Sequence, residues 1–204
     1  DGGHHWGRPV DITEQIYALF DQSRLGPVDA LFFGSGRICQ SRLIRVGHYY
    51  RLYAALCARP GGNRVVYSDD LGRTWQALGD IHTSPAPNGD EPKVEELPNG
   101  DVLLSSRVSG GRLFNIFHYL SERNATGAWE QQPVLSQKEN GGIKALQNST
   151  NGEILLVDAR DNATHRPVRL ALQSVPLVPG RANVGIYYKS LPTTKRLAPE
   201  WEHY

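Results

Sequence analysis

Short strand-like runs joined by turn residues are the feature that most constrains how this chain folds. Three pairs of such runs lie at residues 42–46 and 49–56, 93–97 and 102–106, and 153–158 and 168–175. The first pair flanks Gly47-His48, and the second contains Asn99-Gly100, the kind of step that gives the strongest short-range signal for a β-hairpin. Helical periodicity is confined to residues 12–20, after a candidate cap at Asp11. The pattern predicts an all-β fold assembled from hairpins in chain order.

Composition narrows the class of protein. The 204 residues are enough for one domain, and a hydrophobic fraction of 39% suits a soluble globular fold. The formal net charge of +1 argues against general binding to nucleic acid or to membrane surfaces, and no apolar run approaches the roughly 18 residues of a membrane span. Because the chain starts without Met or a leader, we expect an internal segment of a longer protein. Cys39 and Cys57 form no metal pattern, and we expect two buried free thiols, with a cross-strand disulfide as the alternative.

The four tryptophans suggest a repeat. They recur at intervals of roughly 50 to 70 residues, at positions 6, 75, 129 and 201. A four-stranded propeller blade needs roughly 40–50 residues, and more when it carries insertions. One tryptophan for each blade therefore fits the spacing, and four unrelated core tryptophans are the alternative.

One local motif indicates the family. Residues 68–75 read SDDLGRTW, in which Asp70 can accept N–H groups of its own turn and Gly72 permits a positive φ. Residues 1–6, DGGHHW, match the second half of this pattern, with His in place of Thr, and a degraded copy ends at Trp129. The motif resembles the Asp-box of sialidase-type propellers, a structural staple on the outer rim of a blade. The resemblance implies a six-bladed, all-β propeller, of which residues 1–204 supply roughly half the blades as a partial catalytic domain truncated at both ends.

A second segment carries the candidate chemistry. A two-residue turn at 99–100 would pair Pro98 with Asp101 and, counting outward, bring Glu91 and Arg107 to the same end of one hairpin. By itself this arrangement fits two interpretations equally well: a functional pair, and a cross-strand surface ion pair worth less than about 1 kcal/mol.

The same segment, residues 90–107, resembles the E-x-x-x-x-E-L-x-x-G-x-[LV]-L-x-x-x-R signature of bacterial and trypanosomal sialidases. The resemblance implies that Glu91 is the base of a tyrosine nucleophile and that Arg107 belongs to a three-arginine cluster that binds the sialic acid carboxylate. Arg181, in a stretch that looks like the region of the last arginine, is the second candidate for this cluster, with a solvated turn arginine as the alternative. Arg37 is a weaker candidate for the pocket rim and is more simply a structural arginine.

The implied activity is that of an exo-α-sialidase that removes terminal α-linked sialic acid with retention of configuration. Sialic acid bears its carboxylate on the anomeric carbon, so a tyrosine, neutral until its base takes the proton, replaces the usual carboxylate nucleophile. Arginines suit the sugar carboxylate because their planar fork makes bidentate, charge-assisted bonds. The resemblance further implies sialylated glycoproteins, glycolipids or oligosaccharides as partners, no metal or other cofactor, and a secreted, periplasmic or cell-surface location.

The chain departs from the family pattern in three places. It contains no segment like those that hold the first arginine of the cluster, the aspartate acid/base or the tyrosine nucleophile, and Tyr204 lacks the nucleophile's context. We therefore expect little or no sialidase activity from these 204 residues alone, because catalytic groups act as a unit. Two alternatives stay open: a non-catalytic Asp-box propeller that binds a sialoglycan, and a structural propeller segment of a larger adhesin. A lectin would keep the arginines without needing Glu91, and a structural segment needs neither the arginines nor Glu91.

Overall fold

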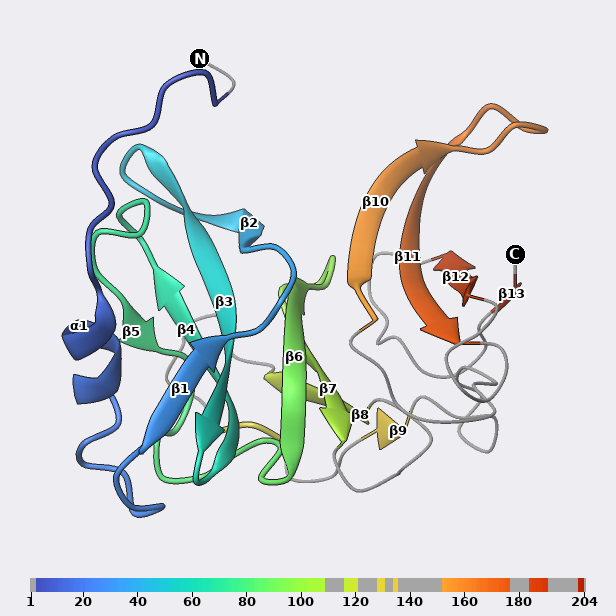
Figure 1. Ribbon diagram of the computed structural model, residues 1–204. Helices are drawn as coiled ribbons and strands as arrows, with labels where there is room; N and C mark the ends of the chain where they lie inside the picture. The colour runs from blue at the N-terminus through green and yellow to red at the C-terminus, as the bar shows by residue number, and fades with distance from the viewer. Residues whose placement is uncertain are drawn as a thin grey trace.

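The computed structural model describes residues 3–108, 116–120, 128–130, 134–135, 152–176, 184–190 and 202–203. They form one short helix, α1 (Thr13–Ala18), and three antiparallel sheets that follow one another along the chain, here called blades A, B and C (Figure 1). Blade A consists of β1 (Ala30–Phe33), β2 (Cys39–Val46), β3 (Tyr49–Arg59), β4 (Gly62–Ser68) and β5 (Gln76–Ala77). Blade B consists of β6 (Gly89–Glu96), β7 (Val102–Val108), β8 (Ile116–Leu120) and β9 (Val134–Leu135). Blade C consists of β10 (Ile154–Arg160), β11 (Pro167–Pro176), β12 (Val184–Ser190) and β13 (Glu202–His203).

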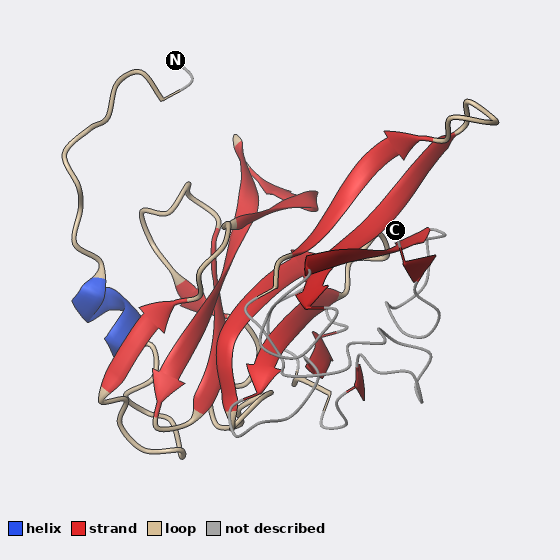
Figure 2. Ribbon diagram, turned by 45° about the vertical axis from the view of Figure 1, so that its right-hand side comes forward, coloured by secondary structure: helices blue, strands red, loops and turns tan. Residues whose placement is uncertain are grey.

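The predicted all-β fold is confirmed, and so are the three predicted hairpins. They correspond to β2–β3, β6–β7 and β10–β11, and β2 turns into β3 through Gly47-His48, where Val46 pairs with Tyr49. Blades B and C are four-stranded meanders in which each strand pairs with the next. In blade A, β1 and β2 pair with different halves of β3, and the sheet continues through β4 to β5. Figure 1 shows the three sheets side by side in chain order, and Figure 2 shows α1 beside the first of them.

The turn between β6 and β7 differs from the sequence prediction by one residue. The N–H of Leu97 donates to the carbonyl of Asp101 at 2.8 Å, so the loop has three residues, and Gly100 has φ +92°. The predicted pairing of Pro98 with Asp101 is wrong because proline has no N–H to donate to the ladder. A three-residue hairpin loop with glycine in the left-handed region takes its place.

Blade A has buried side chains on both of its faces. On one face Ala54, Leu56 and Val66 pack against Ile16 of α1 and Phe20. On the other face a cluster of blade A side chains meets Val94, Val102 and Leu104 of blade B, together with Trp129. Successive residues of β3 point alternately into the two clusters, as strand geometry requires. The helix is shorter than the predicted 12–20, and Asp11 accepts the N–H of Thr13 at 2.8 Å just before it.

The turn between β4 and β5 is formed by residues 68–75, which resemble an Asp-box and are called the Asp-box below. The Asp70 carboxylate accepts the N–H and the hydroxyl of Thr74 at 2.8 and 2.7 Å, and it also accepts the hydroxyl of Ser68 at 2.9 Å. Gly72 has φ +84°, and its carbonyl accepts the indole N–H of Trp75 at 3.1 Å. Trp75 is 5% exposed, as expected for a side chain buried at a turn near the outermost strand of its blade.

Two further tryptophans can be compared with the predicted repeat. Trp129 lies between β8 and β9, as Trp75 lies between β4 and β5; it is 2% exposed and donates to the carbonyl of Leu78 at 3.1 Å. Trp6 is 88% exposed, but Gly3 before it has φ +83°, close to that of the Asp-box glycine. Trp201 lies outside the described residues. Among the described residues no helix is long and apolar enough to cross a membrane.

Both cysteines are free thiols in the core. Cys39 and Cys57 are fully buried and are not bonded to each other, which confirms the preferred sequence prediction. Burial, with the nearby Glu95 carboxylate, raises the pKa of Cys39 to about 12. Burial also raises the pKa of Cys57, and we therefore expect both thiols to be unreactive in the folded chain.

Candidate functional site

The two site residues predicted on the β6–β7 hairpin meet directly. Glu91 lies in a bulge of β6 between the paired residues Gly89 and Pro92, and Arg107 lies opposite it near the end of β7. The Arg107 Nη1 contacts the Glu91 carboxylate, and each side chain is 27% exposed. The one-residue change in register brings the pair closer to direct opposition than the predicted turn would.

The Arg107 fork is only partly used. Its Nη1 faces Glu91 and also lies 3.8 Å from the Asp90 Oδ2. In the part of the chain that the structure describes, neither Nε nor Nη2 of Arg107 has a polar partner. That edge of the guanidinium presents two parallel N–H groups, the geometry that matches a carboxylate.

Two residues beside this pair were missed by the sequence analysis. Arg59, the last residue of β3 in blade A, donates from Nη2 to the Asp90 Oδ1 at 3.2 Å. Its Nη1 donates to the carbonyls of Ala58 and Gly89, both at 3.1 Å. Asp90 could have been predicted near the site because it adjoins Glu91 in the sequence. Nothing local in the sequence links Arg59 to the β6–β7 hairpin.

A lysine and a glutamate form a second polar group along β6. Lys93 is 5% exposed, and its ammonium lies 3.4 Å from the hydroxyl of Ser35 in the β1–β2 connection. Burial lowers the pKa of Lys93 and raises the pKa of Glu153, which immediately precedes β10, and each charge partly offsets the other's shift. β6 therefore meets polar groups of blades A and C next to the Glu91–Arg107 pair.

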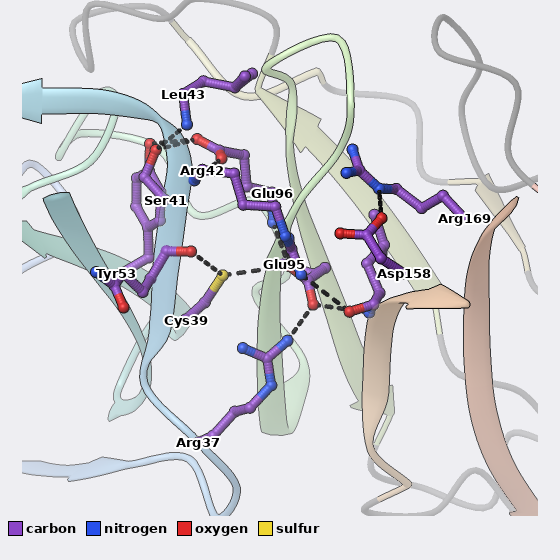
Figure 3. A network of polar contacts seen from close by, with 12 residues as sticks. Arg37, Cys39, Ser41, Arg42, Leu43, Tyr53, Glu95, Glu96, Asp158 and Arg169 are labelled. Carbon is purple, nitrogen blue, oxygen red and sulfur yellow. Dashed lines mark hydrogen bonds and ion pairs between the residues drawn. The ribbon is translucent and has the colours of Figure 1, made fainter. Parts of the chain in front are cut away.

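Further along β6, the Glu95 carboxylate joins all three blades (Figure 3). Glu95 is fully buried. Its carboxylate accepts from five donors: Arg37 Nη2, Arg42 Nη1 at 3.1 Å, the Cys39 thiol at 3.3 Å, and the backbone N–H groups of Glu96 and Leu156, both at 3.0 Å. Arg42 also donates to the carbonyl of Leu156 at 2.9 Å. The N–H and the carbonyl of Leu156 in β10 are thus both satisfied by an ion pair between side chains of blades A and B.

The neighbouring Glu96 holds the irregular part of β2. Its carboxylate accepts the hydroxyl of Ser41 and the N–H of Arg42, both at 2.6 Å. These residues lie where β2 leaves regular register with β3. Arg37 binds Glu95 and not the Glu91 end of the strand, which fits the interpretation of Arg37 as a structural arginine.

Arg181 and Tyr204 lie outside the described residues, so the predicted convergence of Arg181 with Glu91 and Arg107 stays a prediction. Among the described residues, no group of three or more His, Cys, Asp or Glu side chains is placed to hold a metal ion.

Comparisons with known proteins identify the fold. No family model and no curated protein matches the chain. Among solved structures, the intramolecular trans-sialidase of Ruminococcus gnavus, in complex with oseltamivir carboxylate, matches with a TM-score of 0.65 and 17% identity, over 100% of this chain and 37% of that one. Leech intramolecular trans-sialidase, complexed with 2,7-anhydro-Neu5Ac, matches with a TM-score of 0.57 and 16% identity, over 87% of this chain and 24% of that one. Trypanosoma rangeli sialidase, in complex with the inhibitor DANA, matches with a TM-score of 0.57 and 19% identity, over 90% of this chain and 27% of that one.

These matches establish an architecture. The three sheets have the fold of part of a sialidase-type β-propeller, and the chain spans well under half the length of each structure compared. At these levels of identity the likeness shows the fold alone, and the roles of individual residues rest on the geometry described above.

Proposed function

We propose that this chain is part of an exo-α-sialidase of the bacterial type, which releases terminal α-linked sialic acid from glycoproteins, glycolipids or oligosaccharides. Glu91 serves as the base of a tyrosine nucleophile, and Arg107, with Arg181, binds the sugar carboxylate. The observation that carries the proposal is the Glu91–Arg107 pair, in which one carboxylate occupies Nη1 and leaves the Nε–Nη2 edge of the fork without a described partner.

The pair suits the chemistry of a sialoside. An external carboxylate on the Nε–Nη2 edge of Arg107 would make a bidentate, charge-assisted contact without displacing Glu91. Glu91 would then lie beside the anomeric carbon that carries the bound carboxylate. A glutamate there can take the proton from a tyrosine nucleophile that is neutral until it reacts, so no carboxylate has to attack the carbon that bears the sugar carboxylate.

Binding by the 204-residue chain tests the arginine. The probes are the α-methyl glycoside of sialic acid and its methyl ester, which has the same sugar without the negative charge, measured by titration calorimetry or ligand-observed NMR. Arg107→Lys should weaken binding of the acid by about tenfold or more, because lysine keeps the charge but cannot form the bidentate fork. Arg169→Lys is the matched control, since Arg169 pairs with Asp158 at 2.6 Å on blade C. Equal affinities of the Arg107 and Arg169 variants would refute the assignment.

Turnover separates an enzyme from a binding module. With 3′-sialyllactose as substrate, we expect hydrolysis from a version of the chain extended by the blades on either side, and little from the 204 residues alone. Binding that depends on Arg107 but gives no turnover in the extended version would instead favour a non-catalytic sialoglycan-binding propeller. In that case Glu91→Gln would leave the affinity for the acid largely unchanged.

A further inference from the structure

Arg59 and Arg107 occupy corresponding places in successive blades. β3 is the second strand on the path through blade A and β7 is the second strand of blade B. Arg59 is the last residue of β3 and Arg107 is one residue from the end of β7. Each strand pairs there with the first strand of its own blade, Arg59 with Ala30 and β7 with the start of β6. The repeat therefore brings both arginines to the same end of the propeller segment.

A single carboxylate connects the two arginines. Asp90 Oδ1 lies 3.2 Å from Arg59 Nη2, and Asp90 Oδ2 lies 3.8 Å from Arg107 Nη1. The backbone around Asp90 is held firmly, because its carbonyl accepts the side-chain N–H of the buried Asn63 at 2.5 Å. Gly89 packs so closely on Asn63 that an added Cβ would lie 2.0 Å from its Oδ1. Blade A thus fixes the residue that bridges the two guanidinium groups.

Arg59 retains capacity for a ligand. Its Nη1 is occupied by two backbone carbonyls and its Nη2 by Asp90, while Nε has no polar partner in the part of the chain that the structure describes. The side chain is 45% exposed, compared with 27% for Arg107. The guanidinium is therefore oriented by three contacts and still accessible on one side.

We propose that Arg59 is a second anion-binding residue of this site, held beside Arg107 by Asp90, so that a carboxylate-bearing sugar is attracted by both guanidinium groups. The inference rests on the proposed function for the identity of the sugar. Asp90 is a positioning residue in this arrangement. Two guanidinium groups from neighbouring blades offset the charges of Asp90 and Glu91 and present more N–H donors to a bound carboxylate than either blade provides alone.

The competing explanation is an ordinary exposed ion pair between Arg59 and Asp90. The Arg169–Asp158 pair of blade C provides the comparison, because its arginine is 32% exposed and pairs at 2.6 Å. We would measure binding of the α-methyl sialoside and its methyl ester to Arg59→Gln, Arg59→Lys and Arg169→Gln, at low and high salt. Thermal unfolding of each variant shows whether it is folded at the temperature of the titration.

Arg59→Gln should weaken binding of the acid by about tenfold, the value of one lost charge-assisted contact. Arg59→Lys should recover part of that loss, and Arg169→Gln should change the affinity less than twofold. The ratio of acid to ester affinity should fall only in the Arg59 variants. Arg59→Lys retains the charge and the aliphatic stem, so it tests the role even where Arg59→Gln is less stable.

The direction in which Asp90→Asn changes the affinity for the acid tests the positioning role of Asp90. Removing a negative charge beside an anion site strengthens anion binding if only Coulomb attraction matters, whereas loss of positioning weakens it. We expect weaker binding, and tighter binding would overturn the role of Asp90. If Arg59→Gln matches Arg169→Gln while Arg107→Lys loses affinity, the inference about Arg59 fails and the proposed function stands. If the unaltered chain does not bind the sialoside, both fail together.

Discussion

Glu95→Gln tests how the three blades are joined. The substitution preserves the size of the side chain but replaces one acceptor oxygen by an NH₂ group. In the native chain both carboxylate oxygens are surrounded by donors, including Arg42, the thiol of Cys39 and the N–H of Leu156. A glutamine must therefore turn its NH₂ toward other donors, whichever way it is placed. At least one buried N–H or guanidinium contact is lost in either orientation.

The loss of stability expected for Glu95→Gln follows from the burial of the Glu95 side chain. Glu95 is fully buried, whereas its partners Arg37 and Arg42 are 35% and 33% exposed and can regain water. A buried donor left without an acceptor costs about 1–3 kcal/mol, and removing one partner of a fully buried pair costs about 3–5 kcal/mol. Because only one side of this pair is buried, we expect a loss of about 3 kcal/mol in the free energy of unfolding. For a chain of this size that corresponds to a fall in Tm of roughly 6–12 °C.

Urea denaturation followed by tryptophan fluorescence measures this loss, and calorimetry gives the change in Tm. Asp158→Asn is the control, since the Asp158 side chain is 67% exposed and its pairing with Arg169 should contribute little to stability (Figure 3). A loss below about 1 kcal/mol for Glu95→Gln would refute the reasoning, because it would mean that water or local rearrangement satisfies the Glu95 partners.

Three further predictions concern the core and the Asp-box. Hydrogen bonds from Thr74 lower the pKa of Asp70 to about 2, below its unfolded value of 3.8, so its stabilising effect is present above about pH 4 and is lost as the pH falls toward 2. Asp70→Asn should therefore cost about 1 kcal/mol at pH 7 and less at pH 3, by urea denaturation at both pH values; a constant difference would contradict this. Cys39 and Cys57 should not react with a thiol reagent at pH 8 until the chain is denatured, and rapid labelling of the native chain would show that they are accessible. Trp129→Phe should cost about 1 kcal/mol or more through its lost hydrogen bond, and unchanged stability by thermal unfolding would contradict the buried indole contact.

The hairpins were predictable because their turns are local. Gly47-His48 and the segment around Gly100 specify chain reversal within a few residues, and the strand-like runs on either side define the partners. The Asp-box was predictable for the same reason, since Asp70 satisfies groups of its own turn. The register of the β6–β7 hairpin was predicted one residue out, although the missing N–H of Pro98 was visible in the sequence and would have given the correct loop.

The contacts between blades were not predictable from the sequence. Glu95 is one of several charged residues close together in β6, a pattern typical of a solvent-exposed strand face. Its full burial is unexpected from the sequence, because charged side chains are rarely fully buried unless they are paired. Its partners come from β2 and β10, far away in the sequence. The association of Arg59 with Asp90 is of the same kind. Such contacts depend on how the blades are arranged around one another, which local patterns do not encode.

The signature segment of β6 therefore combines two roles that sequence resemblance alone does not separate. At one end Glu91 pairs with Arg107, the proposed ligand site, and at the other Glu95 and Glu96 hold β2 and β10 in place. A propeller without catalytic activity would still need the buried glutamates, because removing them leaves donors of two other blades unsatisfied. It would have less structural need for the Glu91–Arg107 pair, because both side chains are 27% exposed and the pair should contribute less to stability than the fully buried Glu95. Glu95→Gln should thus reduce stability, whereas Arg107→Lys should change ligand affinity at nearly unchanged stability. Arg107→Lys that unfolded the chain as readily as Glu95→Gln would indicate that the whole segment is structural.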